Sequence, residues 1–170
     1  NGIYIYDLQL TAYNEASSKI KEEKGDSLGT AEVTVFAETI DGKPASAWLK
    51  DYALERVKRY VAIESLFDEY GLTLSDDDSN SINDYIKSLD NDLGYYAQYY
   101  GIEESTFGEH FKNMGISKDT LRKITENSYK ESAVFLHNYD KDGLTPVSED
   151  EINSYATENY AAVKLLKVTF

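Results

Sequence analysis

The apolar residues of this chain recur mostly at the three- and four-residue spacing of an amphipathic helix. A long helix is predicted between Asp41 and Gly71, with Pro44 in the first turn, where a proline is tolerated. The apolar stripe of this helix consists of Leu49, Ala53, Val57, Val61 and Phe67. A second stripe, in a helix predicted over residues 76–100, consists of Ile82, Ile86, Leu89, Leu93, Tyr96 and Tyr100.

Further helices are predicted over residues 103–114, 118–139 and 148–159. Their apolar stripes are separate and their connections are short, so the helices are expected to pack on one another rather than on a sheet. The predicted fold class is therefore mainly α.

Glycine followed by an apolar residue marks the predicted helix ends. Such a glycine adopts the left-handed conformation that closes a helix, and the apolar residue then folds back onto the last turn. The pairs are Gly71-Leu72, Gly101-Ile102, Gly115-Ile116 and Gly143-Leu144. The helix starts agree, because Ser75, Ser117 and Ser148 are placed as N-caps, with Glu151 completing a capping box at Ser148.

The amino terminus has a strand-like pattern instead. Asn1-Gly2 is a preferred hairpin dipeptide, so Ile3–Tyr6 is predicted to be the returning strand of a hairpin. A disordered start at Asn1-Gly2 is the alternative. Asp7 is then predicted to cap a helix that runs to about Lys24.

Two other segments are predicted to be extended. The first is "EVTVFAET", with Val33 and Val35 on one face. The second is Val163–Thr169, in the closing sequence "YAAVKLLKVTF", which is expected to lie near Ile3–Tyr6 because edge strands need partners. These unpaired ends lead us to expect a segment of a longer protein whose leader has been removed.

The charge and the composition of the chain limit the kinds of partner that it can bind. The chain has 17 basic and 31 acidic residues, a net charge of −14, which repels polyanions. We therefore expect no nucleic-acid partner, and contact with a membrane only through a removed anchor. No apolar run approaches the ~18 residues that cross a bilayer. The absence of cysteine excludes a disulfide framework, a thiol nucleophile and a thiolate metal site.

No catalytic residue and no cofactor is predicted. His110 and His137 lie far apart and outside any motif, so both are interpreted as partly exposed helix residues. The sequence has no GxSxG, GxGxxG, GxxxxGK[ST] or HExxH pattern. The carboxylates gather at helix starts, where capping and solvation account for them.

One loop has the spacing of a calcium-binding EF-hand. Counting from Asn138, oxygen side chains fall at loop positions 1, 3, 5 and 12, with glycine at position 6. These residues are Asn138, Asp140, Asp142, Gly143 and Glu149. Against calcium, position 1 is not aspartate, position 9 is Pro146, and no second loop is visible. The preferred interpretation is a solvated helix-to-helix loop without metal.

Three stretches of the chain carry a family resemblance: "DGKPASAWLKDYALERVKRYVAIESLFDEYGLTLSDDD", "YYGIEESTFGEHFKNMGISKDTLRK" and "VSEDEINSYATENYAAVKLLKV". In this order they resemble the helical chaperone segment of extracytoplasmic foldases related to SurA and PrsA. That segment shares its fold with the C-terminal region of trigger factor. The opening "NGIYIYDLQLTAY" is similar to the family's initial strand and first helix. Residues 25–43 have no clear counterpart.

The resemblance implies a helical chaperone-like domain over residues 1–160. It also implies that residues 161–170 are the first strand, or a remnant, of a parvulin-type peptidyl-prolyl isomerase domain. The family's histidine on that strand falls at Leu165, which has no hydrogen-bonding side chain. The precursor is expected to be exported and to be a membrane-anchored lipoprotein.

Two functions of different class follow. The preferred one is an ATP-independent chaperone module that binds unfolded exported polypeptides without metal. The alternative is part of a parvulin-type isomerase whose catalytic domain lies downstream. A calcium-binding module at Asn138–Glu149 ranks third. On the helix over 76–100, Tyr95 and Tyr99 are predicted to point away from the core stripe and to form the client-binding patch, the alternative being that a neighbouring helix covers them.

Overall fold

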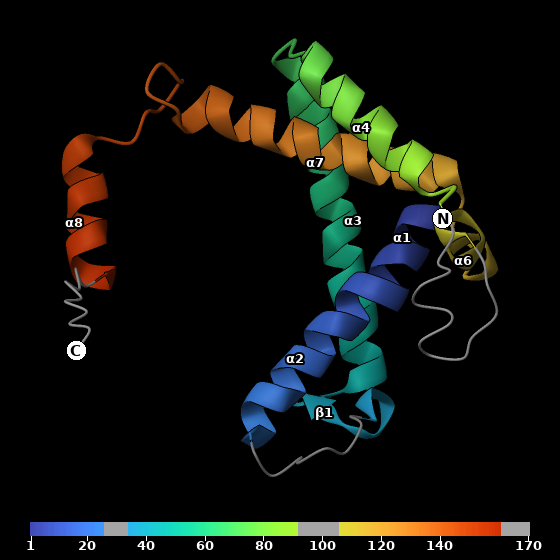
Figure 1. Cartoon of the computed structure of the whole chain (residues 1–170). Coiled ribbons are helices and arrows are strands. Elements are labelled where there is room, and N and C mark those ends of the chain that lie inside the picture. The colour runs from blue at the N-terminus through green and yellow to red at the C-terminus, as the bar shows by residue number, and fades with distance from the viewer. Residues whose placement is uncertain (26–33, 92–105, 161–170) are drawn as a thin grey trace, which may run out of the picture.

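Helices make up most of the computed structural model, which describes residues 1–25, 34–91 and 106–160 (Figure 1). The predicted mainly α class is confirmed. In chain order the helical elements are α1 (Gly2–Tyr6), the π-helix η1 (Asp7–Ala12), α2 (Tyr13–Lys24), the 3-10 helix η3 (Val35–Ala37), α3 (Ala45–Glu69), α4 (Asp76–Ser88), α6 (Phe107–Asn113), α7 (Lys118–Tyr139) and α8 (Glu149–Asn159). Between η3 and α3, the two short strands β1 (Thr39–Ile40) and β2 (Lys43–Pro44) form an antiparallel pair.

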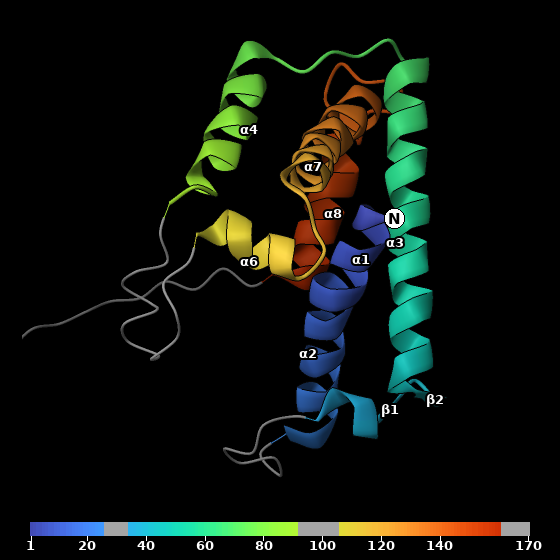
Figure 2. The same ribbon diagram turned by 90° about the vertical axis from the view of Figure 1, so that its right-hand side faces the viewer.

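Helix α3 contacts α1, η1, α2 and α7 directly, whereas α4 and α6 pack on α7. The run of α1, η1 and α2 lies along one end of α3, and α7 crosses the other end with α4 beside it (Figures 1 and 2). Helix α8 follows the far end of α7 and stands apart from α1, α2 and α3 (Figure 1).

Two separate apolar clusters hold these helices together. The lower cluster joins α2 and η3 to the start of α3, and its buried members are Ala12, Ala16, Ile20, Val35, Ile40, Ala45, Trp48 and Leu49. The upper cluster joins α4 and α7 to α1 and α6, with Leu89, Ile116 and Leu121 buried at its centre. Because α1 and η1 supply Ile5 and Leu10 to the upper cluster and Leu8 to the lower one, the amino-terminal helix connects the two.

The predicted strand at Ile3–Tyr6 is wrong, and so is the predicted cap at Asp7. The chain is helical from Gly2 without a break, so Asp7 lies inside the helix with only 5% of its surface exposed. Four alternating apolar residues suit a strand or a buried helix turn equally well. Here the contact between the rings of Tyr6 and Phe111, at 6.5 Å, selects the helix.

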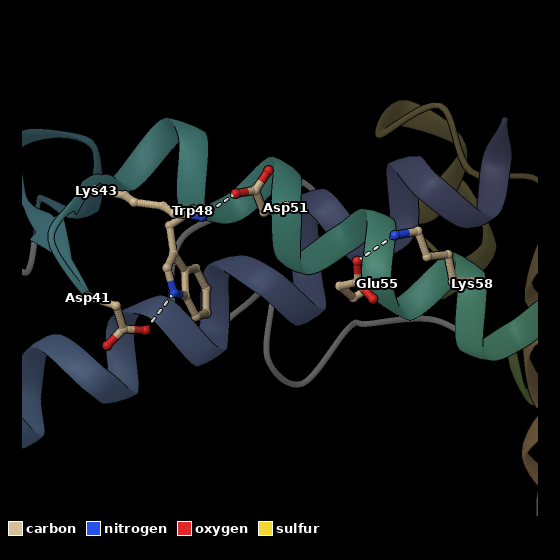
Figure 3. Close-up of polar contacts among 6 residues, drawn as sticks. All are labelled: Asp41, Lys43, Trp48, Asp51, Glu55 and Lys58. Carbon is tan, nitrogen blue, oxygen red and sulfur yellow. Dashed lines mark hydrogen bonds and ion pairs between the residues drawn. The ribbon is translucent and has the colours of Figure 1, made fainter.

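A two-residue hairpin that the sequence analysis missed precedes α3. Its turn is Asp41-Gly42, with φ angles of 50° and 76°, as a type I′ turn requires. Asp41 Oδ2 accepts a hydrogen bond from Trp48 Nε1 at 2.9 Å (Figure 3). It accepts a second one from Lys19 Nζ at 3.0 Å. The Lys19 hydrogen bond first, and then that of Trp48, lower the pKa of Asp41. The hairpin is thereby fastened to both α2 and α3, and Lys43 extends the attachment through its ion pair with Asp51 at 2.6 Å (Figure 3).

Several predicted helix ends are confirmed. Gly71 and Gly115 have φ angles of 63° and 78°, and the amide of the next residue bonds back to the carbonyl of Phe67 and of Phe111 respectively. These are the closures expected of glycine at a helix end. The three predicted serine caps each accept a hydrogen bond from the amide three residues on, and Ser148 with Glu151 forms the predicted capping box.

Gly143 is not a closing glycine of this kind, because its φ is not positive. A Cβ placed there would lie 2.7 Å from the carbonyl oxygen of Asn138. The absence of a side chain is therefore needed for close backbone approach rather than for a left-handed turn.

Two helix boundaries differ from prediction. Helix α4 ends at Ser88 and is therefore shorter than the helix predicted over 76–100. Backbone hydrogen bonds between residues three apart close it, from Ile86 to Asn91. Helix α6 begins after Thr106 rather than at residue 103, because Thr106 and Glu109 form a capping box. The pattern Thr-x-x-Glu was present in the sequence and identifies this start.

Two packing predictions also need correction. Val61 is exposed, although Tyr60 beside it and Glu64 one turn further along both accept hydrogen bonds from Asn127 of α7, so it lies on the side of α3 that α7 leaves uncovered. Of the predicted extended segment, which ends at Thr39, Val35–Ala37 is a 3-10 helix, and Thr39 is the first residue of the strand Thr39–Ile40. Val33 and Val163–Thr169 lie outside the described residues.

Candidate binding surface

Helix α7 has one buried side and one exposed side. Ser117 caps its first turn, and Asn127 and Val134, seven residues apart, face α3. Phe135 and Tyr139 lie about 100° and about 140° around the helix from Val134, and their side chains are 59% and 48% exposed. Their ring centroids are 5.2 Å apart, so the two rings form one aromatic pair on the surface. Leu136 beside them is also exposed.

A polar joint fixes how α7 crosses α3. Asn127 Nδ2 donates to the carbonyl of Tyr60 at 3.1 Å and to Glu64 Oε1 at 2.8 Å. Lys130 Nζ donates to the other oxygen of Glu64 at 2.6 Å and lies 5.3 Å from the centre of the Phe67 ring. These contacts hold the middle of α7, so its C-terminal end projects in a defined direction.

Helix α8 begins at a well-formed cap, but no described part of the chain buries any of its residues. Ser148 N donates to Glu151 Oε2 at 2.9 Å, and Glu151 N donates to Ser148 Oγ at 3.3 Å. The backbone hydrogen bond from Ser148, followed by the one from its side chain, lowers the pKa of Glu151. No residue of α8 is buried.

Exposed apolar side chains are concentrated at this end of the chain. Of thirteen large apolar side chains exposed among the described residues, eight lie between residues 135 and 160. We call these eight the C-terminal apolar surface: Phe135, Leu136, Tyr139, Leu144, Val147, Ile152, Tyr155 and Tyr160. They belong to the end of α7, the connecting loop, α8 and the residue that follows α8 (Figure 1). Phe135 contacts Tyr139 and Tyr155 contacts Tyr160, so these side chains include two exposed aromatic pairs, which are candidates for contact with other molecules.

A second apolar feature is a hollow of about 280 Å³ at the lower end of α3. Leu8, Tyr13, Phe36 and Leu49 supply its apolar walls, and the rings of Tyr13 and Phe36 are 6.1 Å apart. Lys50 stands among its polar lining residues. Its volume lies just below the range of about 300–1,000 Å³ that is typical of small-molecule pockets.

Among the described residues, Asp7 is the most buried charged side chain, and its contacts are those of a structural ion pair. Asp7 Oδ1 lies 3.4 Å from Arg56 Nε, beside a small cavity of about 70 Å³ between η1, α3 and α7. Burial raises the pKa of Asp7, whereas the Arg56 charge and a hydrogen bond with Thr11 lower it. No histidine is among the residues that line this cavity, and its lining hydroxyl of Ser128 is hydrogen-bonded to the carbonyl of Thr125.

The predicted client-binding residues Tyr95 and Tyr99 lie outside the described residues, so the patch assigned to them stays a prediction. Leu165 lies outside them as well. The same reasoning applied to residues 118–139 identifies Phe135 and Tyr139, an i, i+4 aromatic pair off the apolar stripe, which the sequence analysis overlooked.

The loop with EF-hand spacing does not bring its oxygens together. Asn138 is still part of α7, where its Nδ2 donates to the carbonyl of Val134 at 2.7 Å and its Oδ1 accepts from the hydroxyl of Tyr70 at 3.4 Å. Within residues 1–25, 34–91 and 106–160, no three acidic or histidine side chains are grouped so as to hold a metal ion. Of the two histidines, His110 is exposed and His137 packs on the Tyr70 ring at 4.6 Å.

Comparison with known proteins returned no family model, no curated protein and no solved structure that matches this chain. Among the described residues, no helix combines the length and the apolar character needed to cross a membrane. The candidate site therefore has to be argued from its own geometry.

Proposed function

We propose that this chain is an ATP-independent chaperone module that holds unfolded polypeptides on its C-terminal apolar surface. The observation that carries the proposal is the concentration of exposed apolar side chains from Phe135 to Tyr160, on a helix end and a helix that nothing else in the described chain covers. The resemblance of the sequence to SurA- and PrsA-like foldases supports the same class. By that resemblance the clients are exported polypeptides, and the module works outside the cytoplasm as part of a lipoprotein.

The composition of the surface suits transient binding. Three of its side chains are tyrosines, Tyr139, Tyr155 and Tyr160. A tyrosine ring buries apolar area while its hydroxyl stays hydrated. Spread over a helix end, a loop and α8, these side chains offer many weak contacts rather than one deep pocket, which fits clients of varied sequence. The charge of −14 keeps the chain soluble in spite of the exposed rings.

The test is suppression of aggregation, followed by light scattering, with reduced lysozyme as a basic client and reduced α-lactalbumin as an acidic one. The test variant carries Phe135→Ser and Tyr139→Ser, which removes aromatic area without adding charge. The matched control carries Leu54→Ser and Val61→Ser, because these side chains of α3 are 48% and 59% exposed, as Tyr139 and Phe135 are.

The test variant should suppress aggregation less well than the wild type, and the control variant should equal the wild type. Both should keep their melting temperatures, since substitutions at exposed positions usually change stability by less than about 0.5 kcal/mol. If the wild-type chain suppresses aggregation of neither client, the proposed function is wrong.

A further inference from the structure

Helix α8 is exposed around its whole circumference. Every residue from Glu149 to Tyr160 is exposed. Ile152 and Tyr155 lie on one side of the helix at i, i+3 spacing, and the Tyr155 ring contacts that of Tyr160 at 6.2 Å. A helix of eleven residues is only marginally stable in water without tertiary packing. A partner that covers this apolar side would therefore stabilise the helix as it binds.

Carboxylates flank the apolar side of α8. At 100° per residue, Glu149 lies about 60° to one side of Ile152. Glu158 lies about 60° beyond Tyr155 on the other side. A segment lying along Ile152 and Tyr155 therefore has negative charge on both its edges.

Within the part of the chain that the structure describes, these carboxylates have no lysine or arginine partner. Residues 140–160 contain six acidic side chains and a single lysine, Lys141, a net charge of −5. Among the described residues, none of the six forms an ion pair with a lysine or arginine. The six are Asp140, Asp142, Glu149, Asp150, Glu151 and Glu158. On α3 and α7, by contrast, Glu64 and Glu131 are paired with Lys130 and Arg59.

We propose that α8 and the loop before it select unfolded segments in which apolar residues are interspersed with lysine or arginine. This inference rests on the proposed function and names the class of client. The apolar residues of the segment cover Ile152 and Tyr155, and its cations lie against the flanking carboxylates. A second copy of this chain is disfavoured as the occupant, because it would bring the same acidic surface and a net charge of −14. An acidic segment meets the same repulsion.

The experiment compares short labelled peptides that share one pattern of phenylalanine and leucine and differ only at the intervening positions. These positions are lysine in the first peptide, glutamine in the second and glutamate in the third. Binding to the full chain is measured by fluorescence anisotropy at about 0.05 M and about 0.5 M salt. Surface charges act over a longer distance at the lower salt concentration and are largely screened at the higher one.

Two neutralised variants separate local from overall charge. The α8 variant carries Glu149→Gln, Asp150→Asn and Glu158→Gln, and leaves Glu151 in its capping box. The control variant carries Glu22→Gln, Glu23→Gln and Asp77→Asn, which changes the net charge equally at exposed positions far along the chain. Circular dichroism of both variants checks that helix content is kept.

The lysine peptide should bind the wild type about fivefold more tightly than the glutamine peptide, and the glutamate peptide more weakly than either, since one exposed ion pair contributes less than about a tenfold step. High salt and the α8 variant should remove this preference, and the control variant should keep most of it. Equal binding of the three peptides, or an equal loss in both variants, overturns the charge selection and leaves the proposed function standing. If no peptide binds at either salt concentration, the proposed function fails as well.

Discussion

Replacing Asn127 tests whether the polar joint holds α7 on α3. Asn127→Ala removes two hydrogen bonds, one to the carbonyl of Tyr60 and one to the carboxylate of Glu64. A hydrogen bond to a neutral group contributes about 0.5–1.5 kcal/mol and one to a charged group about 1.5–3 kcal/mol. Glu64 keeps Lys130 as a partner, so no buried charge is left unpaired. The free energy of unfolding should therefore fall by roughly 2–4 kcal/mol.

Urea titration measures this loss, with circular dichroism reporting on all helices and the fluorescence of Trp48 reporting on the lower cluster. Trp48 is the only tryptophan in the chain, so its signal has one origin. The control is Ser128→Ala, the next residue along α7, whose hydroxyl bonds only to the carbonyl of Thr125 in its own helix. A loss below about 0.5 kcal/mol, or one equal to that of the control, would refute the assignment of Asn127 to the joint.

Three further predictions concern single positions. Burial raises the pKa of Asp7 in the folded state, so the folded state gains stability relative to the unfolded chain as the pH falls through that raised pKa. In urea titrations at neutral and acidic pH, the free energy of unfolding of the wild type should therefore rise in acid relative to that of Asp7→Asn. Gly115→Ala places a Cβ at a φ of 78° and should cost about 1 kcal/mol in the same titration. Calcium at micromolar concentration should not raise the melting temperature, and a rise that Glu149→Gln abolishes would restore the EF-hand interpretation.

Features that depend on neighbours in the sequence could be predicted. The serine caps at Ser75, Ser117 and Ser148, and the glycine closures at Gly71 and Gly115, are set by side chains or φ angles within one helical turn. The same local rules would have given the hairpin at Asp41-Gly42 and the start of α6, had those signals been used.

Features that depend on distant contacts could not be predicted. Ile3–Tyr6 is helical because residues more than a hundred positions away complete the upper cluster. The exposure of Val61 is decided by where other helices meet α3, and the π-helical stretch at η1 has no signature in the pattern. In the candidate site, the aromatic pair could be read from the periodicity of α7, whereas the isolation of α8 depends on the direction that the loop gives it (Figure 1).

The sharing of the amino-terminal helix by both clusters sets an order for folding. The described residues of the lower cluster all lie between Leu8 and Tyr52, so its loops are short and it can close early. The upper cluster pairs Ile5 and Tyr6 with Ile116 and Leu121, and closing that long loop has to wait for α7. The lower cluster can therefore form before α7 is in place, whereas the apolar side of α1 is covered when α7 packs on it.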